Sequence, residues 1–279
     1  MMRGMDFSLT DAERDLVGLC RDFAQKEIAT RAPLAWEEGR CPTDLLREMG
    51  ELGLIGMLVP EEWGGIGMST VGFVAAMEQI GLADQSVAAA WQAHVTIGSL
   101  PLYLFGTDAQ RERWLRPLAE GTALGAFGLT EPDAGSDARG ISTRAEPKDG
   151  GWLVNGRKTF ISNAGTDMSF GVTLLARTPS APEGAPRYGS FVVEKDTPGF
   201  TMGPKMRGIG WKGLDTGVVD ADACTLAVHV PTATGGSWCF GRSGLGGQRS
   251  LRRSGPLQPE RELLLRCAAI RLHDEPVNG

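Results

Sequence analysis

A run of small and polar residues between positions 127 and 137 has the composition of a loop that can hold an anionic group. It reads Phe127-Gly-Leu-Thr-Glu-Pro-Asp-Ala-Gly-Ser-Asp137 and begins as a predicted strand. Because glycine and alanine have little or no side chain, main-chain amides near 134–136 can approach a phosphate closely and donate to it. Thr130 and Ser136 add hydroxyl groups. An ordinary β-turn, in which Asp and Gly are common, is the competing interpretation.

A second segment, residues 158–165, places an aromatic ring beside a hydroxyl group. Side chains alternate between the two faces of a strand, so Phe160 and Ser162 are expected on one face and Ile161 on the other. A flat heteroaromatic ring could pack on such a face and hydrogen-bond to the hydroxyl. A phenylalanine in the core of a β domain is the competing interpretation of Phe160.

The residues before these segments predict helices. Side chains suited to capping precede four predicted helices, at Thr10, Ser69, Asp84 and Thr107. Glu13 and Gln110 complete capping boxes at the first and the last of them. We expect the helix that follows Asp84 to end at Gly98. Residues 1–123 are therefore predicted to form an all-helical domain.

After residue 123 the pattern changes to short apolar runs separated by Gly, Pro and Asn. The predicted strands are residues 125–130, 141–145, 152–154, 158–162, 170–177, 190–194 and 200–204. Asn155-Gly156 is the strongest hairpin signal. Short strands without intervening helices favour an antiparallel barrel or sandwich, and no Rossmann glycine motif opens a helix. The expected fold class is α+β, with a β domain over residues 124–228.

The end of the chain follows neither the helical nor the strand period. From about Gly217 it is rich in Gly, Arg and Ser, so we expect an irregular tail over residues 229–279. A region that fails to complete the fold and an ordinary solvated extension are equally good interpretations of that tail.

In chain order, the two chemistry-bearing segments resemble the middle domain of acyl-CoA dehydrogenases. The similarity extends upstream and downstream of them over most of the chain. The motifs that carry it are residues 60–65, 114–117, 127–137, 155–158, 160–165, 189–194 and 215–216. An ordered string of this length is far more specific than any single turn.

The resemblance implies FAD as the cofactor and acyl-CoA as the substrate. The residues implied at the flavin are Phe127, Leu129, Thr130, Gly135, Ser136, Phe160, Ile161 and Ser162. Ser136 is expected at the pyrophosphate and near the thioester. The acyl chain is expected along one helix face at positions i, i+3, i+4 and i+7, formed by Ala90, Ala93, His94 and Ile97. Packing of that face against the helical core is an equally good interpretation.

The activity implied is α,β-dehydrogenation of an acyl-CoA thioester, in which a carboxylate removes the α-proton and a hydride passes to the flavin. Electrons would then go to an electron-transferring flavoprotein, and members of the family form homo-oligomers. After Asp215-Thr216 the family continues into a helical bundle that supplies the catalytic base, and no residue here matches the base motif. We therefore expect a truncated protein with no assigned catalytic residue, and we hypothesise that a frame shift produced the tail.

Two other functions remain open on the sequence alone. One is a non-catalytic module that binds flavin, acyl-CoA or a full-length partner subunit. The other is a flavin oxidase or monooxygenase of the same fold, because the motif indicates where the flavin binds and not which electron acceptor is used.

Composition excludes several further classes of function. The 279 residues carry a formal net charge of −6, which argues against a nucleic-acid partner. Five cysteines without a C-x-x-C pair and three scattered histidines give no disulfide framework and no metal site. The most apolar stretch is too short to cross a bilayer, so no membrane association and a cytoplasmic location are expected.

Overall fold

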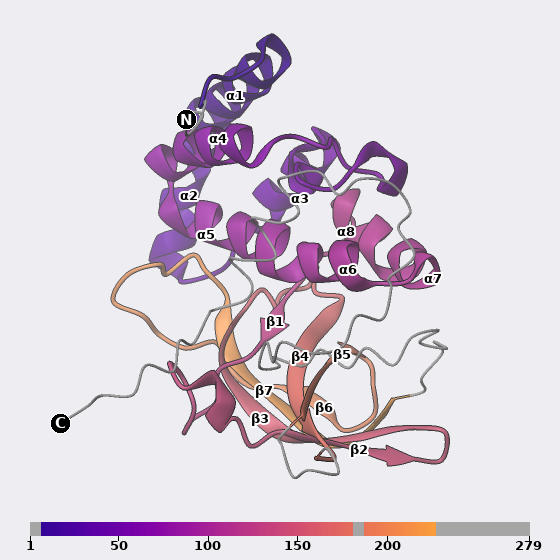
Figure 1. Ribbon diagram of the computed structural model, residues 1–279. Helices are drawn as coiled ribbons and strands as arrows, with labels where there is room; N and C mark the ends of the chain where they lie inside the picture. The colour runs from indigo at the N-terminus through magenta and orange to yellow at the C-terminus, as the bar shows by residue number, and fades with distance from the viewer. Residues whose placement is uncertain (1–6, 181–186, 227–279) are drawn as a thin grey trace, which may run out of the picture.

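The computed structural model describes residues 7–180 and 187–226. A layer of helices lies against one end of a twisted sheet, with α1 farthest from the strands (Figure 1). The strands β1 to β7 follow the helices in the chain, as the pattern change near residue 123 predicts. The expected division into a helical part and a strand-rich part is confirmed.

The helical layer is built from short helices with the expected caps. The α-helices are α1 (Asp11–Phe23), α2 (Ala29–Glu38), α3 (Thr43–Glu51), α4 (Thr70–Ala83), α5 (Gln85–Ala93), α6 (Leu100–Phe105), α7 (Asp108–Gln110) and α8 (Arg116–Ala119). Capping boxes are present at Thr10 and Thr107. The side chains of Ser69 and Asp84 accept main-chain hydrogen bonds at the starts of α4 and α5. All four predicted caps are confirmed.

Wider or tighter turns join several of these helices. Three segments are π-helical: η1 (Ala24–Ile28), η4 (His94–Ser99) and η5 (Arg111–Leu115). Three are short 3₁₀ turns: η2 (Leu54–Gly56), η3 (Glu61–Trp63) and η6 (Ala138–Gly140). The core of the helical layer centres on Trp91, which is fully buried, packs edge-on against Phe73 and donates to the carbonyl oxygen of Leu54 at 3.0 Å.

The predicted end of a helix at Gly98 is wrong. The chain stays helical through η4 and continues into α6. Gly98 instead allows its helix to lie close to the main chain of Gly125, because a Cβ at position 98 would lie 2.8 Å from the carbonyl carbon of Gly125. This glycine–glycine contact lets the helical layer pack against the segment that precedes β1.

The sheet has seven strands and is mixed. The strands are β1 (Phe127–Gly128), β2 (Arg144–Lys148), β3 (Gly151–Ser162), β4 (Gly171–Thr178), β5 (Arg187–Glu194), β6 (Phe200–Met202) and β7 (Thr216–Leu226). Their order is β1-β4-β2-β3-β7-β6, with β5 paired to β4. Because β1 and β2 run parallel to β4, the expectation of a purely antiparallel barrel or sandwich is corrected to an open mixed sheet.

The predicted hairpin at Asn155-Gly156 is also wrong, because β3 passes straight through these residues. The turn lies at Asp149-Gly150, where both residues have positive φ (49° and 78°), as a two-residue hairpin requires. Gly156 instead sits at a register shift between β3 and β7. A Cβ on Gly156 would lie 2.3 Å from Oγ1 of Thr143, so the neighbouring segment excludes any side chain here.

The loss of pattern predicted from Gly217 does not occur over the residues that the structure describes. Residues 216–226 form β7, which pairs with almost the whole of β3. Val219 and Ala221 are buried while Asp220 and Asp222 lie on the other face, so the period of two is present but carried by small residues. The predicted tail at 229–279, the missing bundle and the frame-shift hypothesis lie outside the described residues.

Candidate functional site

The two segments singled out in the sequence lie against one another. The main-chain amide of Thr159 donates to the carbonyl oxygen of Thr130 at 2.8 Å. The ammonium group of Lys158 donates to the carbonyl oxygen of Leu129 at 3.1 Å. The loop that follows β1 is therefore fixed along the end of β3.

A buried ion pair also holds this loop in place. Glu131 and Lys158 meet at 2.8 Å, and the side chain of each is only 2% exposed. The Glu131 carboxylate also accepts from the main-chain amides and the hydroxyls of Ser142 and Thr143. These two residues precede β2, so a single carboxylate joins the loop after β1 to β2 and β3.

The ionisation of this pair follows from its contacts. Burial alone would raise the pKa of Glu131, but hydrogen bonds from Lys158, Ser142 and Thr143 outweigh burial and lower the pKa to about 2. Burial lowers the pKa of Lys158 in spite of the attraction of Glu131. The carboxylate, with five donors around it, is therefore ionised.

Phe160 stands out of the sheet. The pairing of β3 with β7 shifts register between Lys158 and Ile161, and Phe160 adopts a left-handed conformation with φ of 59°. Its side chain is 65% exposed, which rules out the competing interpretation of a core phenylalanine. Ile161 packs in the β core at 2% exposure, so this residue can offer a ligand only its main chain.

Three hydroxyl groups of the two segments have free hydrogen-bonding capacity. Within the described chain, the side chains of Thr130, Ser136 and Ser162 have no hydrogen-bond partner, and Ser136 is exposed. A Cβ on Gly135 would meet no atom within 4 Å, so the loop is open on that side. Phe127 lies in β1 beside Thr173 of β4, and Leu129 packs against the small cluster of Ala134, Ile141, Leu175 and Tyr188.

Asn163 anchors the end of β3 to the helical layer. It is fully buried with φ of 67°, and its side-chain amide donates to the carbonyl oxygen of Ala90 at 2.8 Å. Its own main-chain amide donates to the carbonyl oxygen of Asp215, whose carboxylate accepts from Gly165 at 2.8 Å. Burial raises the pKa of Asp215 above its usual range.

The helix face predicted to line the acyl chain is partly used for packing. Ala90 accepts from Asn163, and Nδ1 of His94 accepts from the amide of Gly125 at 2.8 Å, so both residues join the two layers. Burial lowers the pKa of His94 to about 4, which keeps the ring neutral. The π turn at 94–99 shifts the helical phase, and Ile97 is 46% exposed while Ala93 is buried. The four residues therefore do not share one face.

Sequence reasoning missed the residues that hold the site in place. In the sequence, Lys158, Asn163 and Asp215 stand out only as members of longer motifs. Lys158 lies between Arg157 and Thr159, so no apolar neighbour marks it as buried, although a lysine that is fully buried almost always has a partner. An asparagine before a small residue tolerates positive φ, which is a signal of a turn.

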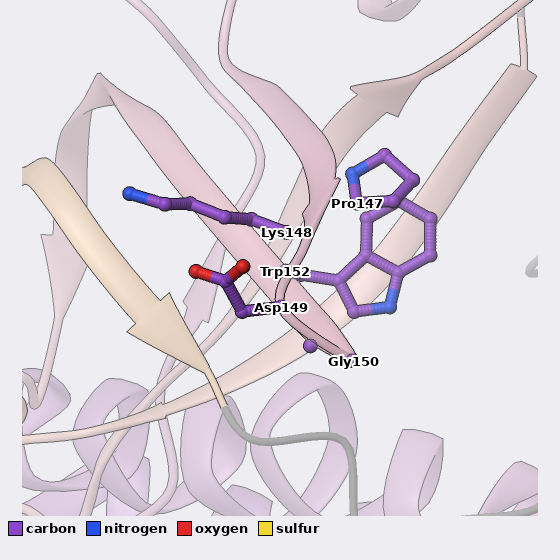
Figure 2. A pocket seen from close by; sticks show the side chains of 6 residues that line it. Pro147, Lys148, Asp149, Gly150 and Trp152 are labelled. Carbon is purple, nitrogen blue, oxygen red and sulfur yellow. The ribbon is translucent and has the colours of Figure 1, made fainter.

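Two surface hollows of the described residues do not include Phe160 in their walls. One, of about 380 Å³, lies at the turn between β2 and β3, where the rings of Pro147 and Trp152 adjoin while Lys148 and Asp149 point away from them (Figure 2). The other, of about 500 Å³, lies where β2 meets β4 and includes Arg144 and Arg177 in its wall.

Residues 7–180 and 187–226 contain neither a cluster of metal-binding side chains nor a membrane-spanning helix. No group of three His, Cys, Asp or Glu side chains in these ranges could hold a metal ion. No helix there has the length and apolar character needed to cross a bilayer.

Comparison with known proteins gives matches over both layers. Residues 10–122 match the model of the acyl-CoA dehydrogenase N-terminal domain, and residues 126–224 match that of the middle domain. A probable acyl-CoA dehydrogenase of Bacillus subtilis is 40% identical over 82% of this chain and 59% of its own length.

Two solved structures superimpose on the described layers. Butyryl-CoA dehydrogenase of Megasphaera elsdenii has a TM-score of 0.74 at 35% identity, over 80% of this chain and 58% of its own. An acyl-CoA dehydrogenase of Bacillus anthracis, solved in complex with FAD, has a TM-score of 0.71 at 31% identity, over 78% of this chain and 37% of its own. The chain thus spans less than two thirds of the length of these relatives.

Proposed function

The chain belongs to the acyl-CoA dehydrogenase family, and from this membership we propose that it binds FAD and takes part in the α,β-dehydrogenation of an acyl-CoA thioester. The observation that carries the proposal is the loop after β1, pinned by Glu131 and Lys158 next to a protruding Phe160 ring. An exposed aromatic ring held by a strained backbone is a costly arrangement unless a ligand uses it.

The residues around this ring suit FAD. Phe160 offers a flat apolar face for the isoalloxazine, and Thr130 and Ser162 offer hydroxyls for its polar edge. Gly135 and Ser136 offer an open loop with main-chain amides for the pyrophosphate. Phe127, Leu129 and Ile161 contribute main chain and apolar support. When bound, FAD supplies a hydride acceptor.

The chain's own contribution in this proposal is to orient its ligands. Glu131 is not a suitable base, because its carboxylate is buried, accepts five hydrogen bonds and has its pKa lowered to about 2. It positions the loop instead. Ser136 is proposed to contact the thioester end of the substrate, and Ala93 and Ile97 are the residues of the predicted acyl face not engaged in joining the layers. No catalytic base is assigned.

A second candidate function is a flavin- and acyl-CoA-binding module without turnover. The engagement of Glu131 favours it, because the buried carboxylate of residues 127–137 is already committed to structure. For either candidate, an electron-transferring flavoprotein as partner, association into homo-oligomers, a cytoplasmic location and domain limits at residues 123 and 228 stay proposals from the sequence.

The test is a titration of the purified full chain. We expect bound flavin to give an absorption spectrum in the visible range, and anaerobic addition of butyryl-CoA to bleach it if the chain turns substrate over. A flavin spectrum without bleaching supports the binding module. A chain that neither carries nor takes up flavin contradicts both candidates.

A further inference from the structure

Four arginines of the strand layer have no acidic partner among the residues that the structure describes, in contrast to those of the helical layer. Each arginine described between residues 11 and 119 donates to a side-chain oxygen. Among the residues that the structure describes, no such contact is found for the guanidinium groups of Arg139, Arg144, Arg177 and Arg187. In an acidic chain, with net charge −6, this grouping is a local positive region.

Two of these arginines are direct neighbours across the sheet. Arg144 of β2 and Arg177 of β4 are partners in the parallel register, so both side chains leave the sheet on the same face, and both are exposed. Like charges directly opposite one another destabilise a pair of strands. An anion between them removes that repulsion.

The two arginines border a hollow large enough for a small molecule. Its volume is about 500 Å³, within the usual range of roughly 300–1,000 Å³ for ligand sites. Thr178 and Ser180 contribute hydroxyls to its wall, and Glu146 is the acidic residue among the described residues that line it. Arg187 is the cross-strand partner of Thr178, one of the residues in that wall.

Hydrogen bonds connect the hollow to residues 127–137, the segment proposed to hold the flavin. The amide of Arg177 donates to the carbonyl oxygen of Thr143 at 2.8 Å, and Thr143 is bound to Glu131. Tyr188, the cross-strand partner of Arg177, donates to the carbonyl oxygen of Arg139 at 2.7 Å. The loop that contains Ser136 is therefore joined to the part of the strand layer that carries the four arginines.

We propose that Arg144 and Arg177 form a binding site for the phosphorylated ADP end of coenzyme A. This inference rests on the proposed function, because that function makes an acyl-CoA thioester the ligand. Coenzyme A carries a diphosphate and a phosphate monoester, which itself contributes roughly −1.5 to −2 charges at neutral pH. FAD carries only the diphosphate, so several unpaired arginines match coenzyme A better. Arginine also suits phosphate geometry through its paired donors.

The test measures binding of three probes to the full chain by isothermal titration calorimetry: CoA, 3′-dephospho-CoA and FAD. The test variant is Arg144→Gln/Arg177→Gln. The control is Lys148→Gln/Lys195→Gln. It removes the same number of positive charges, from exposed lysines that do not border the hollow. Circular dichroism verifies folding, and Arg144→Lys/Arg177→Lys retains the charge if the glutamine variant does not fold.

We expect the arginine variant to raise the Kd for CoA about tenfold, which corresponds to about 1.4 kcal/mol. The Kd for 3′-dephospho-CoA should rise less, and the Kd for FAD should not change. The lysine control should change the Kd for CoA less than about twofold, the size expected of a screened charge at a distance.

Four results overturn the inference: an unchanged Kd for CoA, an equal loss in the lysine control, a loss of FAD binding in place of CoA binding, or no binding of CoA to the unaltered chain. Its failure is distinct from failure of the proposed function. CoA binding that depends on the arginines in a chain without flavin contradicts the function alone, and flavin-bound protein that binds CoA independently of the arginines contradicts the site alone.

Discussion

Replacing Glu131 by glutamine tests how the loop after β1 is held. The carboxylate and the Lys158 ammonium are both nearly inaccessible to water, and the carboxylate accepts from the amides and hydroxyls of Ser142 and Thr143. In Glu131→Gln the charge of Lys158 stays buried without a counter-ion. The NH₂ group of the new side chain also faces donors, with which it cannot hydrogen-bond.

Removing one partner of a buried ion pair costs about 3–5 kcal/mol. For a chain of this size we expect Glu131→Gln to lower Tm by roughly 6–20 °C. Lys158→Met should cost less, about 2 kcal/mol, because Glu131 keeps four of its five donors. The double variant should be more stable than Glu131→Gln alone, since neither charge is then left unpaired.

The assay is denaturant unfolding of the two single variants and the double variant, with a matched exposed pair as control. Arg157 and Asp220 form an ion pair beside the buried one, with side chains 61% and 30% exposed. Arg157→Gln should cost much less than Glu131→Gln, because exposed ion pairs contribute little to stability. If Glu131→Gln costs no more than Arg157→Gln, the buried pair does not hold the loop and the reasoning is wrong.

The remaining predictions concern pH and close packing. Because burial lowers the pKa of His94 to about 4, the folded chain resists protonation that the unfolded chain accepts below 6.5. This group should therefore remove up to roughly 3 kcal/mol of stability as pH falls from 6.5 to 4, and urea unfolding of His94→Gln should show a flatter pH profile. Gly98→Ala should destabilise by at least about 2 kcal/mol, because its Cβ would lie 2.8 Å from the main chain of Gly125, and a neutral result contradicts the close approach of the layers. Gly81→Ala in α4, whose Cβ would lie 3.7 Å from that of Ala88, should instead stabilise by about 0.4–1 kcal/mol in thermal unfolding.

The parts of the fold that depend on local chemistry could be predicted from the sequence. Thr10, Ser69, Asp84 and Thr107 cap helices because a short polar side chain reaches the free amides of the next turn. The direction of β1 and β2 relative to β4 could not be predicted, because strand pairing depends on contacts between distant segments and not on the pattern within a strand.

The wrong predictions concern glycines that are required by a contact with a segment distant in the sequence. Asn155-Gly156 has the composition of a turn, but Gly156 is needed because Thr143 lies against it. Gly98 likewise serves the contact with Gly125 and does not end a helix. The site itself was predicted in part: the segments at Thr130 and Thr159 do meet, whereas the π turn that separates Ile97 from Ala90 and His94 leaves no pattern in a single sequence.

The central claim is that Phe160 and the loop before it form a flavin site, and equilibrium titration of the full chain with FAD, followed by quenching of flavin fluorescence, tests it most directly. Phe160 and Phe7 are matched for the comparison, since they are 65% and 66% exposed and Phe7 precedes α1 in the helical layer. The account predicts saturable binding that Phe160→Ala weakens at least tenfold, about 1.4 kcal/mol, and that Phe7→Ala leaves unchanged. No saturable binding, or equal binding by both variants, contradicts it.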